Sequence, residues 1–223
     1  MIKTAYPLQL RFAPGEKWEY CNVGYFALAE IIRKVTGKPW SSFLSERVFA
    51  PLEMNATRPT SATDVIQNRA DGYAWEDNKL QNDGFLLALR PSGAFLSTVF
   101  DLAKWDAALY TNKILKQSFQ EQMWTPVKLN DGAEYSYGFG WELSKVGSHK
   151  LVHHGGSLGG FRSEFARFID DKLTIIILAN GNNAKPYLIA LGVAAFYIPN
   201  LTPEQRAVAA VEANPKPFDG YAK

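Results

Sequence analysis

This chain of 223 residues contains a single cysteine, Cys21, and no long hydrophobic run. One cysteine cannot form an internal disulfide, so the sequence leaves the redox compartment open. The apolar run over residues 173–179 is far too short to span a membrane. An apolar leader of the signal-peptide type is also missing from the N-terminus, so the sequence does not indicate where the protein resides.

An excess of charge of either sign is absent as well. The 24 basic and 22 acidic residues leave a formal net charge of +2. Nucleic acid is therefore not an expected partner, because phosphate binding needs clustered lysine and arginine. Hydrophobic residues make up 47% of the chain and aromatic residues 13%, which indicates a globular protein with a substantial core or a cleft lined with rings. At this length, one large domain or two small ones are expected.

The first half of the chain has the periodicity of helices. Apolar residues at helical spacing over 23–35 predict a helix, with Asn22 as its N-cap and Gly37 as its C-terminal stop. The spacing Thr98-x-x-Asp101 is that of a capping box, which predicts that another helix begins there.

The second half has the pattern of strands and one closing helix. The strand patterns cover residues 137–143, 150–153, 161–168 and 173–178, and an apolar helix is expected over 184–197. Helices followed by an antiparallel sheet with a covering helix predict an α+β fold. Three parts are predicted: a mostly helical lobe at residues 1–135, the sheet with its helix at residues 136–200, and a linker or tail at residues 201–223. The turn-rich residues 52–83 are expected to form a loop region or lid.

Tyr20 and Asn22 stand two residues apart, just before the first predicted helix. A phenol near a catalytic cation can lose its proton and act as a general base, and an Asn amide can hold a substrate amide or orient a lysine. The structural alternative is that Tyr20 packs against its neighbours and Asn22 only caps the helix. Taken alone, the pair does not distinguish a catalytic motif from a structural one.

His154 opens a glycine-rich stretch at the end of a strand pattern. Gly155 and Gly156 would let a ligand backbone lie against the strand, and the amide of Ser157 is a candidate oxyanion donor. The structural alternative is a lone histidine with a packing or exposed role. A zinc site is not expected, because His153 and His154 are adjacent on a strand, where side chains alternate faces, and no third ligand is suitably spaced. No metal or other cofactor is therefore predicted.

Several motifs occur together and in order. They are Phe12-x-Pro-Gly-Glu-x-Trp-x-Tyr-x-Asn-x-Gly-Tyr25, Pro51-Leu-x-Met54-x-x-Thr57, Pro91-Ser-Gly93, Asp101-Leu-Ala-Lys-Trp105, Tyr137-Gly-x-Gly-Trp141 and His154-Gly-Gly-x-x-Gly-Gly-Phe161. In these motifs the chain resembles the serine β-lactamase-related family, which holds class C β-lactamases, D-Ala-D-Ala carboxypeptidases and related esterases. The resemblance covers about residues 8–198 and implies a β-lactamase/transpeptidase-like fold.

The resemblance also implies roles for individual residues. Tyr20 matches the family's second-motif tyrosine, the general base or its partner, and Asn22 matches the asparagine that contacts substrate and the catalytic lysine. His154 stands where the third motif opens with lysine or histidine, and Gly155 and Gly156 complete that motif. The backbone of Ser157 would supply one oxyanion donor. The implied substrate is a small molecule, a β-lactam, peptide or ester, and histidine in place of lysine favours the esterase and peptidase relatives.

The family's nucleophile is missing from this sequence. It belongs to a Ser-x-x-Lys motif on a helix before the tyrosine motif, and no serine in the chain is followed by lysine three residues later. The resemblance implies that the chain lacks the family's N-terminal helix, first strands and nucleophile helix. In the family the strand that matches residues 173–178 pairs with those first strands, so we expect an unpaired apolar edge here. The chain is therefore expected to self-associate or to be completed by another polypeptide segment.

These observations leave three functional interpretations. The first is a serine hydrolase of this family that acts by acylation and deacylation but is inactive as this chain alone, because serine and lysine are missing. The second is a non-catalytic, truncated relative that serves as a binding or interaction module. The third is a thiol enzyme using Cys21 with His154, which is disfavoured because Cys21 lies between two residues assigned to the cleft and would point the other way.

Overall fold

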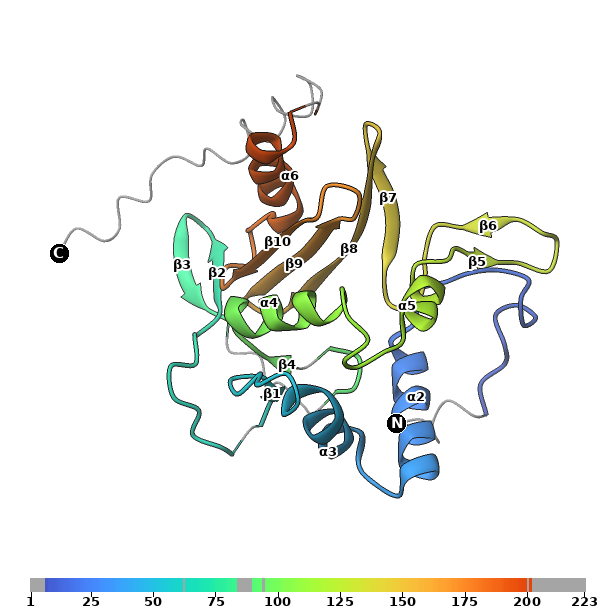
Figure 1. Cartoon of the computed structure of the whole chain (residues 1–223). Helices are drawn as coiled ribbons and strands as arrows, with labels where there is room; N and C mark the ends of the chain where they lie inside the picture. Colours follow the sequence, from blue (N-terminus) through green and yellow to red (C-terminus); the bar gives the residue numbers. More distant parts are fainter. Residues whose placement is uncertain (1–6, 62, 84–89, 94, 200, 202–223) are drawn as a thin grey trace. The chain divides into compact units, whose positions relative to one another are not determined.

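The computed structural model describes residues 7–61, 63–83, 90–93, 95–199 and 201 (Figure 1). The chain divides into two compact units, Met1–Arg69 with Leu86–Trp141 and Ala70–Phe85 with Glu142–Lys223. The second unit thus takes a segment from the middle of the first. The divisions expected at residues 135 and 200 remain predictions. No helix in the described ranges is both long and apolar enough to cross a bilayer.

The first unit is built mostly from helices. The helical elements are α2 (Asn22–Thr36), α3 (Trp40–Leu44), the π-helix η1 (Ser45–Phe49), α4 (Val99–Ala108) and α5 (Gln117–Met123). Two short antiparallel pairs accompany them: β1 (Arg58–Pro59) with β4 (Phe95–Leu96), and β5 (Val127–Lys128) with β6 (Glu134–Tyr135). A small core cluster of Leu52, Met54 and Ala108 joins the end of η1 to α4.

Helix α2 ends as predicted but begins differently. Gly37 adopts a φ of 72° and donates its amide hydrogen to the Arg33 carbonyl at 2.9 Å, which is a left-handed C-terminal stop. The N-cap is Cys21, with no side-chain cap, and Asn22 is the first helical residue. The prediction of Asn22 as the N-cap is therefore wrong. Its side-chain oxygen instead accepts a 3.4 Å hydrogen bond from the Tyr20 hydroxyl, which lies outside the helix.

The apolar stripe of α2 is largely exposed. Leu28, Ile31 and Val35 occupy successive turns of one face and are 53%, 54% and 79% exposed. Ala29 is the only buried residue of the helix. The helical periodicity therefore predicted the helix correctly. An apolar stripe usually packs against a partner, but no such partner is found among the described residues.

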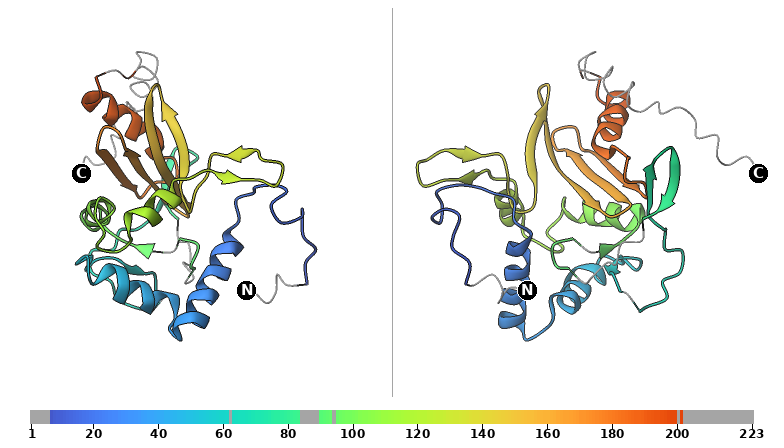
Figure 2. Two further views of the ribbon diagram at one scale, coloured as in Figure 1. Left: turned by 45° about the vertical axis from the view of Figure 1, so that its right-hand side comes forward. Right: turned by 180° about the vertical axis from the view of Figure 1, so that it is seen from behind.

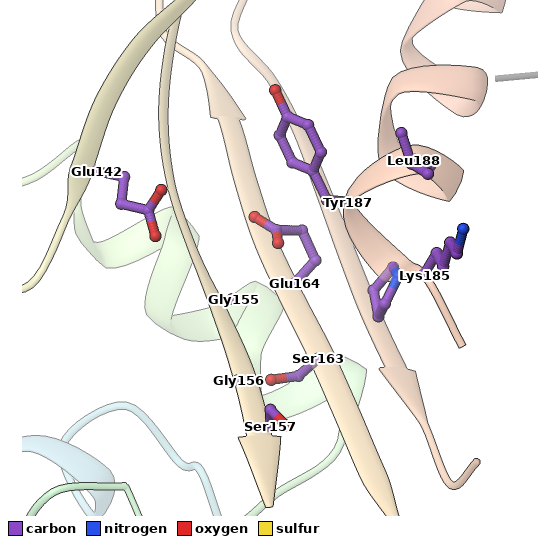
Figure 3. A pocket seen from close by; sticks show the side chains of 10 residues that line it. Glu142, Gly155, Gly156, Ser157, Ser163, Glu164, Lys185, Tyr187 and Leu188 are labelled. Atoms are coloured by element: carbon purple, nitrogen blue, oxygen red, sulfur yellow. The ribbon is translucent and has the colours of Figure 1, made fainter. Parts of the chain in front are cut away.

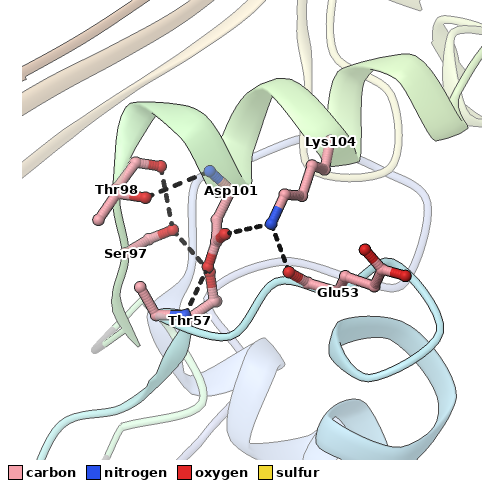
Figure 4. Close-up of polar contacts among 7 residues, drawn as sticks. Glu53, Thr57, Ser97, Thr98, Asp101 and Lys104 are labelled. Atoms are coloured by element: carbon pink, nitrogen blue, oxygen red, sulfur yellow. Dashed lines mark hydrogen bonds and ion pairs between the residues drawn. The ribbon is translucent and has the colours of Figure 1, made fainter.

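A buried carboxylate joins α4 to the segment before β1 (Figure 4). One oxygen of Asp101 accepts hydrogen bonds from the Ala56 amide at 2.8 Å and the Thr57 hydroxyl at 2.9 Å. Its other oxygen accepts from Lys104 Nζ at 3.2 Å, and Lys104 also donates to the Glu53 carbonyl. Burial acts to raise the pKa of Asp101, but the bonds from Thr57, Lys104 and Ala56 and the charge of Lys104 outweigh it, so the pKa lies below its usual value.

The capping box predicted at the start of α4 forms only in part. The Thr98 hydroxyl accepts a hydrogen bond from the Asp101 amide at 3.2 Å, so Thr98 is the N-cap. The reciprocal bond, from the Thr98 amide to the Asp101 carboxylate, is replaced by the bonds to Ala56 and Thr57. The Asp101 side chain thus binds the segment before β1 and does not cap the end of the helix.

The second unit is a four-stranded antiparallel sheet covered by a helix. The strand order is β10 (Leu173–Ala179), β9 (Phe161–Phe168), β8 (His149–Leu158) and β7 (Glu142–Val146). Helix α6 (Pro186–Tyr197) packs against β9 and β10 (Figure 1, Figure 2). The core between helix and sheet contains Val146, Leu151, Ala166, Phe168, Ile175, Ala190, Ala194, Ile198 and Leu201. The expected α+β fold, with an antiparallel sheet and a covering C-terminal helix, is confirmed.

A β-hairpin occupies part of the region that was expected to be a loop. Strands β2 (Tyr73–Glu76) and β3 (Lys79–Asn82) are joined by Asp77 and Asn78, with φ values of 50° and 59°. Two successive positive φ angles define the turn that suits the twist of a two-residue hairpin. The Tyr73 amide donates to the Asn180 carbonyl at 3.0 Å, so the hairpin is tied to the segment after β10.

We predict that Asp101→Ala lowers the free energy of unfolding by about 2–4 kcal/mol, because it leaves the Ala56 amide without its acceptor and the buried Thr57 hydroxyl with Ser97 as its remaining partner. Glu121→Ala, at an exposed position of α5, should change it by less than about 0.5 kcal/mol. Urea unfolding of the three proteins measures both values. Equal effects of the two substitutions would contradict the role given to Asp101.

The Asp101 contribution should also depend on pH. The folded-state pKa lies below the unfolded one, so the stabilisation is present above about pH 3.9 and is lost as the pH falls through the folded-state value. The stability difference between the wild type and Asp101→Asn should therefore be constant near neutral pH and shrink in acid. If the stability difference between the two proteins instead grows as the pH falls, the pKa of Asp101 is higher in the folded state than in the unfolded state.

Gly160→Ala should destabilise the second unit by about 1–3 kcal/mol. A Cβ atom there would lie 2.3 Å from the Tyr73 nitrogen and 2.5 Å from the Gly72 carbonyl carbon, both backbone atoms. As a matched control, Gly24→Ala places its Cβ in open space within α2 and should stabilise by about 1 kcal/mol. Thermal unfolding of both variants tests the pair, and a neutral Gly160→Ala would disprove the close docking of the hairpin.

Candidate functional site

The segment that leads to Tyr20 is held by contacts within the first unit. The ring of Trp18 stacks on Tyr135, with centroids 4.1 Å apart and planes 14° apart. Further upstream, the Asn130 amide donates to the Gly15 carbonyl at 2.9 Å, and the Asn130 side chain donates to the Pro14 carbonyl at 2.9 Å. The Pro-Gly turn and Trp18 thus fix the approach of the chain to Tyr20.

The structure brings Tyr20 and Asn22 together at the start of α2. Tyr20 is 48% exposed, and its hydroxyl donates to Asn22 Oδ1 at 3.4 Å. Cys21, between them, is exposed and has the extended backbone angles φ −143° and ψ 107°. An exposed phenol beside an amide can exchange a proton with a bound molecule and orient it through the amide.

His154 lies on β8, opposite Phe165 of β9. Its Nδ1 is 2.7 Å from the Gly155 carbonyl oxygen. A carbonyl can only accept, so Nδ1 carries the hydrogen, and in the neutral ring Nε2 is the nitrogen with the lone pair. The side chain is half-buried. This tautomer suits Nε2 to accept a proton or a hydrogen bond.

Gly155, Gly156 and Ser157 continue β8 and are exposed. A Cβ on Gly156 would lie 2.4 Å from Ser163 Oγ, and one on Gly155 would lie 3.1 Å from Glu164 Oε2. Side chains of the neighbouring strand thus lie close to both glycines, although each of these contacts is with a side-chain end that can move. Ser157 pairs with Arg162 in the ladder.

His153 points to the opposite face of β8 and has a different environment. It is buried, its Nδ1 lies 3.0 Å from Glu164 Oε1, and its Nε2 lies 3.8 Å from Glu142 Oε2. Its ring stacks on Tyr187 of α6 at a centroid distance of 5.1 Å. Burial, followed by the charges of Glu164 and Glu142, raises the pKa of the Tyr187 hydroxyl.

A cavity of about 590 Å³ opens between this face of the sheet and the start of α6 (Figure 3). It is lined by Glu142, Gly155, Gly156, Ser157, Ser163, Glu164, Lys185, Pro186, Tyr187 and Leu188. Gly155, Gly156 and Ser157, which were predicted as site residues, thus line the cavity, whereas His154 does not. Glu142, Glu164 and Tyr187 were missed by the sequence analysis. A signal for Glu164 was present, because strand alternation places it on the same face as the apolar Ala166 and Phe168.

Tyr20 and Asn22 belong to the first unit, and His154, Gly155, Gly156 and Ser157 to the second. Each set is therefore assembled locally, by the start of α2 and by β8 respectively. Within the described residues, no group of three histidine, cysteine or acidic side chains is arranged to hold a metal ion.

Comparison with known proteins gives concordant results. A sequence profile of the family described as Beta-lactamase matches residues 1–196. Penicillin-binding protein 4* of Bacillus subtilis (strain 168) is 31% identical over 202 residues, covering 84% of this chain and 45% of the relative. A D-aminopeptidase of Brucella canis is 27% identical over 216 residues, covering 94% of this chain and 40% of the relative.

A solved structure is also similar. The D-amino acid amidase of Ochrobactrum anthropi SV3, crystallised with L-phenylalanine, superimposes with a TM-score of 0.69 at 26% identity, over 95% of this chain and 60% of the amidase. The chain spans less than half the length of the curated relatives just described. Its agreement with the family profile nevertheless extends over most of the 223 residues, from the tyrosine motif through the sheet and into α6. The chain belongs to the Beta-lactamase family, a family of serine hydrolases and their relatives.

Proposed function

We propose that this chain forms part of a serine hydrolase that cleaves amide bonds of D-amino-acid derivatives by acyl transfer. The observation that carries the proposal is the family match over residues 1–196. Relatives named as a D-aminopeptidase and a D-amino acid amidase support the substrate class. A histidine rather than a lysine at position 154 also favours peptidase and esterase chemistry over that of a β-lactamase.

In this proposal Tyr20 moves the proton and Asn22 orients the substrate. Tyr20 first has to lose the proton that its hydroxyl donates to Asn22 in this structure. A serine oxygen then attacks the amide carbonyl while its own proton passes to the phenolate oxygen of Tyr20, and the C–N bond breaks as the amine leaves with that proton. Water, deprotonated in turn by Tyr20, attacks the acyl-serine, releases the acid and restores the serine. The 3.4 Å contact between the Tyr20 hydroxyl and Asn22 Oδ1 keeps the two polar groups on one side of the segment.

His154 and the strand after it, in the second unit, are given the roles that the family resemblance implies for the third motif. Nδ1 is engaged with the Gly155 carbonyl, which directs Nε2 to the substrate as acceptor or, when protonated, as donor. Gly155, Gly156 and Ser157 pair with β9 on one side and lie beyond the last pair with β7, Glu142–His153, on the other. In our proposal, amides that point to that second side stabilise the oxyanion of the tetrahedral intermediate.

The nucleophile of this reaction comes, in our proposal, from residues outside these 223. No serine in the sequence has lysine three positions later. The same absence favours a second candidate function, in which the chain binds a ligand or partner without catalysis. The two candidates differ in whether an added Ser-x-x-Lys segment yields turnover.

We expect this chain alone to give no turnover of D-phenylalanine p-nitroanilide, nitrocefin or p-nitrophenyl acetate and no covalent label from a fluorophosphonate. A chimera that carries the preceding segment of Penicillin-binding protein 4* of Bacillus subtilis should hydrolyse the D-anilide. Labelling of the chain alone would reveal another nucleophile and contradict the proposal. A folded but inert chimera would favour the binding function.

In the active chimera, Tyr20→Phe should lower kcat/KM by about 10²–10⁴, the usual contribution of a positioned general base. Tyr110→Phe is the matched control, since Tyr110 is 50% exposed and lies in the same unit. Steady-state kinetics with circular dichroism as a folding check measure both. If the two substitutions have the same small effect, Tyr20 does not carry the proton.

A further inference from the structure

The cavity at the start of α6 is built from the second unit alone. All of its lining residues belong to that unit and come from β7, β8, β9 and the start of α6. None of the lining residues belongs to β10, so the cavity is separate from the sheet edge at which the sequence analysis expects the family's missing first strands. With a volume of about 590 Å³, it has the size of a small-molecule site.

Two carboxylates stand on either side of a glycine in this cavity. Gly155 of β8 pairs with Glu164 of β9, and His153, two residues earlier on the same face of β8, pairs with Glu142 of β7. Directly paired residues share a face of the sheet, so Glu142 and Glu164 both point to the side of α6 (Figure 3). Gly155 has no side chain to fill the space between them, and a ligand group placed over Gly155 has a carboxylate on each side.

The carboxylate of Glu164 is buried, yet only one of its oxygens is hydrogen-bonded. The side chain is 4% exposed, and its Oε1 accepts from Nδ1 of His153 at 3.0 Å. The other oxygen, Oε2, lies over Gly155, 3.1 Å from the position that a Cβ atom would take there. It accepts no hydrogen bond from any residue that the structure describes. Since buried polar atoms need a partner, this oxygen indicates a ligand that donates hydrogen bonds and carries positive charge.

Tyr187 lines the cavity from the side of α6 and lies within the field of both carboxylates. Burial raises the pKa of its hydroxyl, and the charges of Glu164 and Glu142 raise it further. Lys185 also lines the cavity, but its side chain extends away from the two carboxylates (Figure 3). The space between the sheet and Tyr187 is therefore negatively charged and suits a cation.

We propose that this cavity binds the free α-ammonium group of the substrate, so that the enzyme acts on D-amino-acid amides whose amino group is unblocked. The inference rests on the proposed function, because it assigns a subsite to that same reaction. An ammonium group has three hydrogens to donate. Three acceptors line the cavity to receive them: Glu164 Oε2, the Glu142 carboxylate and the Tyr187 hydroxyl.

The dimensions suit a single amino-acid residue. Ser157, whose amide is the proposed oxyanion donor, is two residues beyond Gly155 on β8, which is about 7 Å along a strand. A hydrogen bond of about 2.9 Å at the ammonium group and another at the carbonyl oxygen, with the bonds from the nitrogen through the α-carbon to the carbonyl between them, span this distance. An acyl group on the nitrogen would remove its charge and place bulk between the two carboxylates.

The chain alone should bind D-phenylalaninamide, because it contains every lining residue of the cavity, and should bind N-acetyl-D-phenylalaninamide at least about tenfold more weakly. Isothermal titration calorimetry measures both. Glu164→Gln should raise the dissociation constant of D-phenylalaninamide by about tenfold or more, the loss expected for a hydrogen bond to a charged group. Glu142→Gln should raise it by about threefold, since that side chain is 51% exposed and its charge is screened by water.

Glu76→Gln is the matched control, because Glu76 is an exposed acidic residue of the same unit that does not line the cavity. It should leave the dissociation constant unchanged, and circular dichroism should show all three variants folded. If Glu164→Gln unfolds, the comparison of Glu142→Gln with Glu76→Gln decides. Equal affinity for the free and the acetylated amide would overturn the proposal. So would a chain that binds neither compound, or cavity variants that bind as Glu76→Gln does.

Failure of this inference is distinguishable from failure of the proposed function. Suppose that the chimera with Penicillin-binding protein 4* is active and hydrolyses D-phenylalanine p-nitroanilide and its N-acetyl derivative with equal kcat/KM. The ammonium subsite is then overturned, whereas the proposed function stands. A folded, inert chimera that still binds the free amide and not the acetylated one has the opposite meaning: the proposed reaction fails and the ammonium subsite stands.

Discussion

The buried carboxylate of Asp101 is the constraint on which the packing of the first unit depends. A charge in that position is tolerated only because an amide, a hydroxyl and an ammonium group converge on it. Those donors come from chain segments more than forty residues apart, so the single side chain fixes where the loop before β1 meets α4. The Thr98 hydroxyl holds the start of the same helix. The small apolar cluster of Leu52, Met54 and Ala108 then completes the junction.

Much of the fold follows from periodicity in the sequence. The end of α2 at Gly37, the strand Phe161–Phe168 and the apolar final helix were predictable because each depends on a local pattern. The β2–β3 hairpin was missed, since its strands are short and largely exposed and only the Asp-Asn turn indicates it. The error at Asn22 has a similar origin, because a side chain that can cap a helix can equally accept from a neighbouring hydroxyl.

In the candidate site too, some features are visible in a short stretch of sequence, whereas others depend on contacts between separate elements. The motif around Tyr20 and the glycines after His154 are recognisable in the sequence, and each is assembled by its own element. The Glu164–His153–Tyr187 arrangement depends on contacts between β8, β9 and α6, which no single segment reveals. Adjacent histidines on one strand thus have unrelated environments, because alternation directs His153 to the face of α6 and His154 to the opposite face.

The geometry of Tyr20, the proposed proton carrier, depends on whether helix α2 is formed. With one buried residue in fifteen, the helix has little tertiary packing, and isolated helices of this length are marginally stable in water. Its local opening therefore costs little free energy, and the contact between Tyr20 and Asn22 depends on it, because Asn22 is the first residue of the helix. A molecule that covers Leu28, Ile31 and Val35 stabilises the closed helix. Occupancy of that face and the geometry of Tyr20 are thus thermodynamically linked, so ordering of either one favours the other.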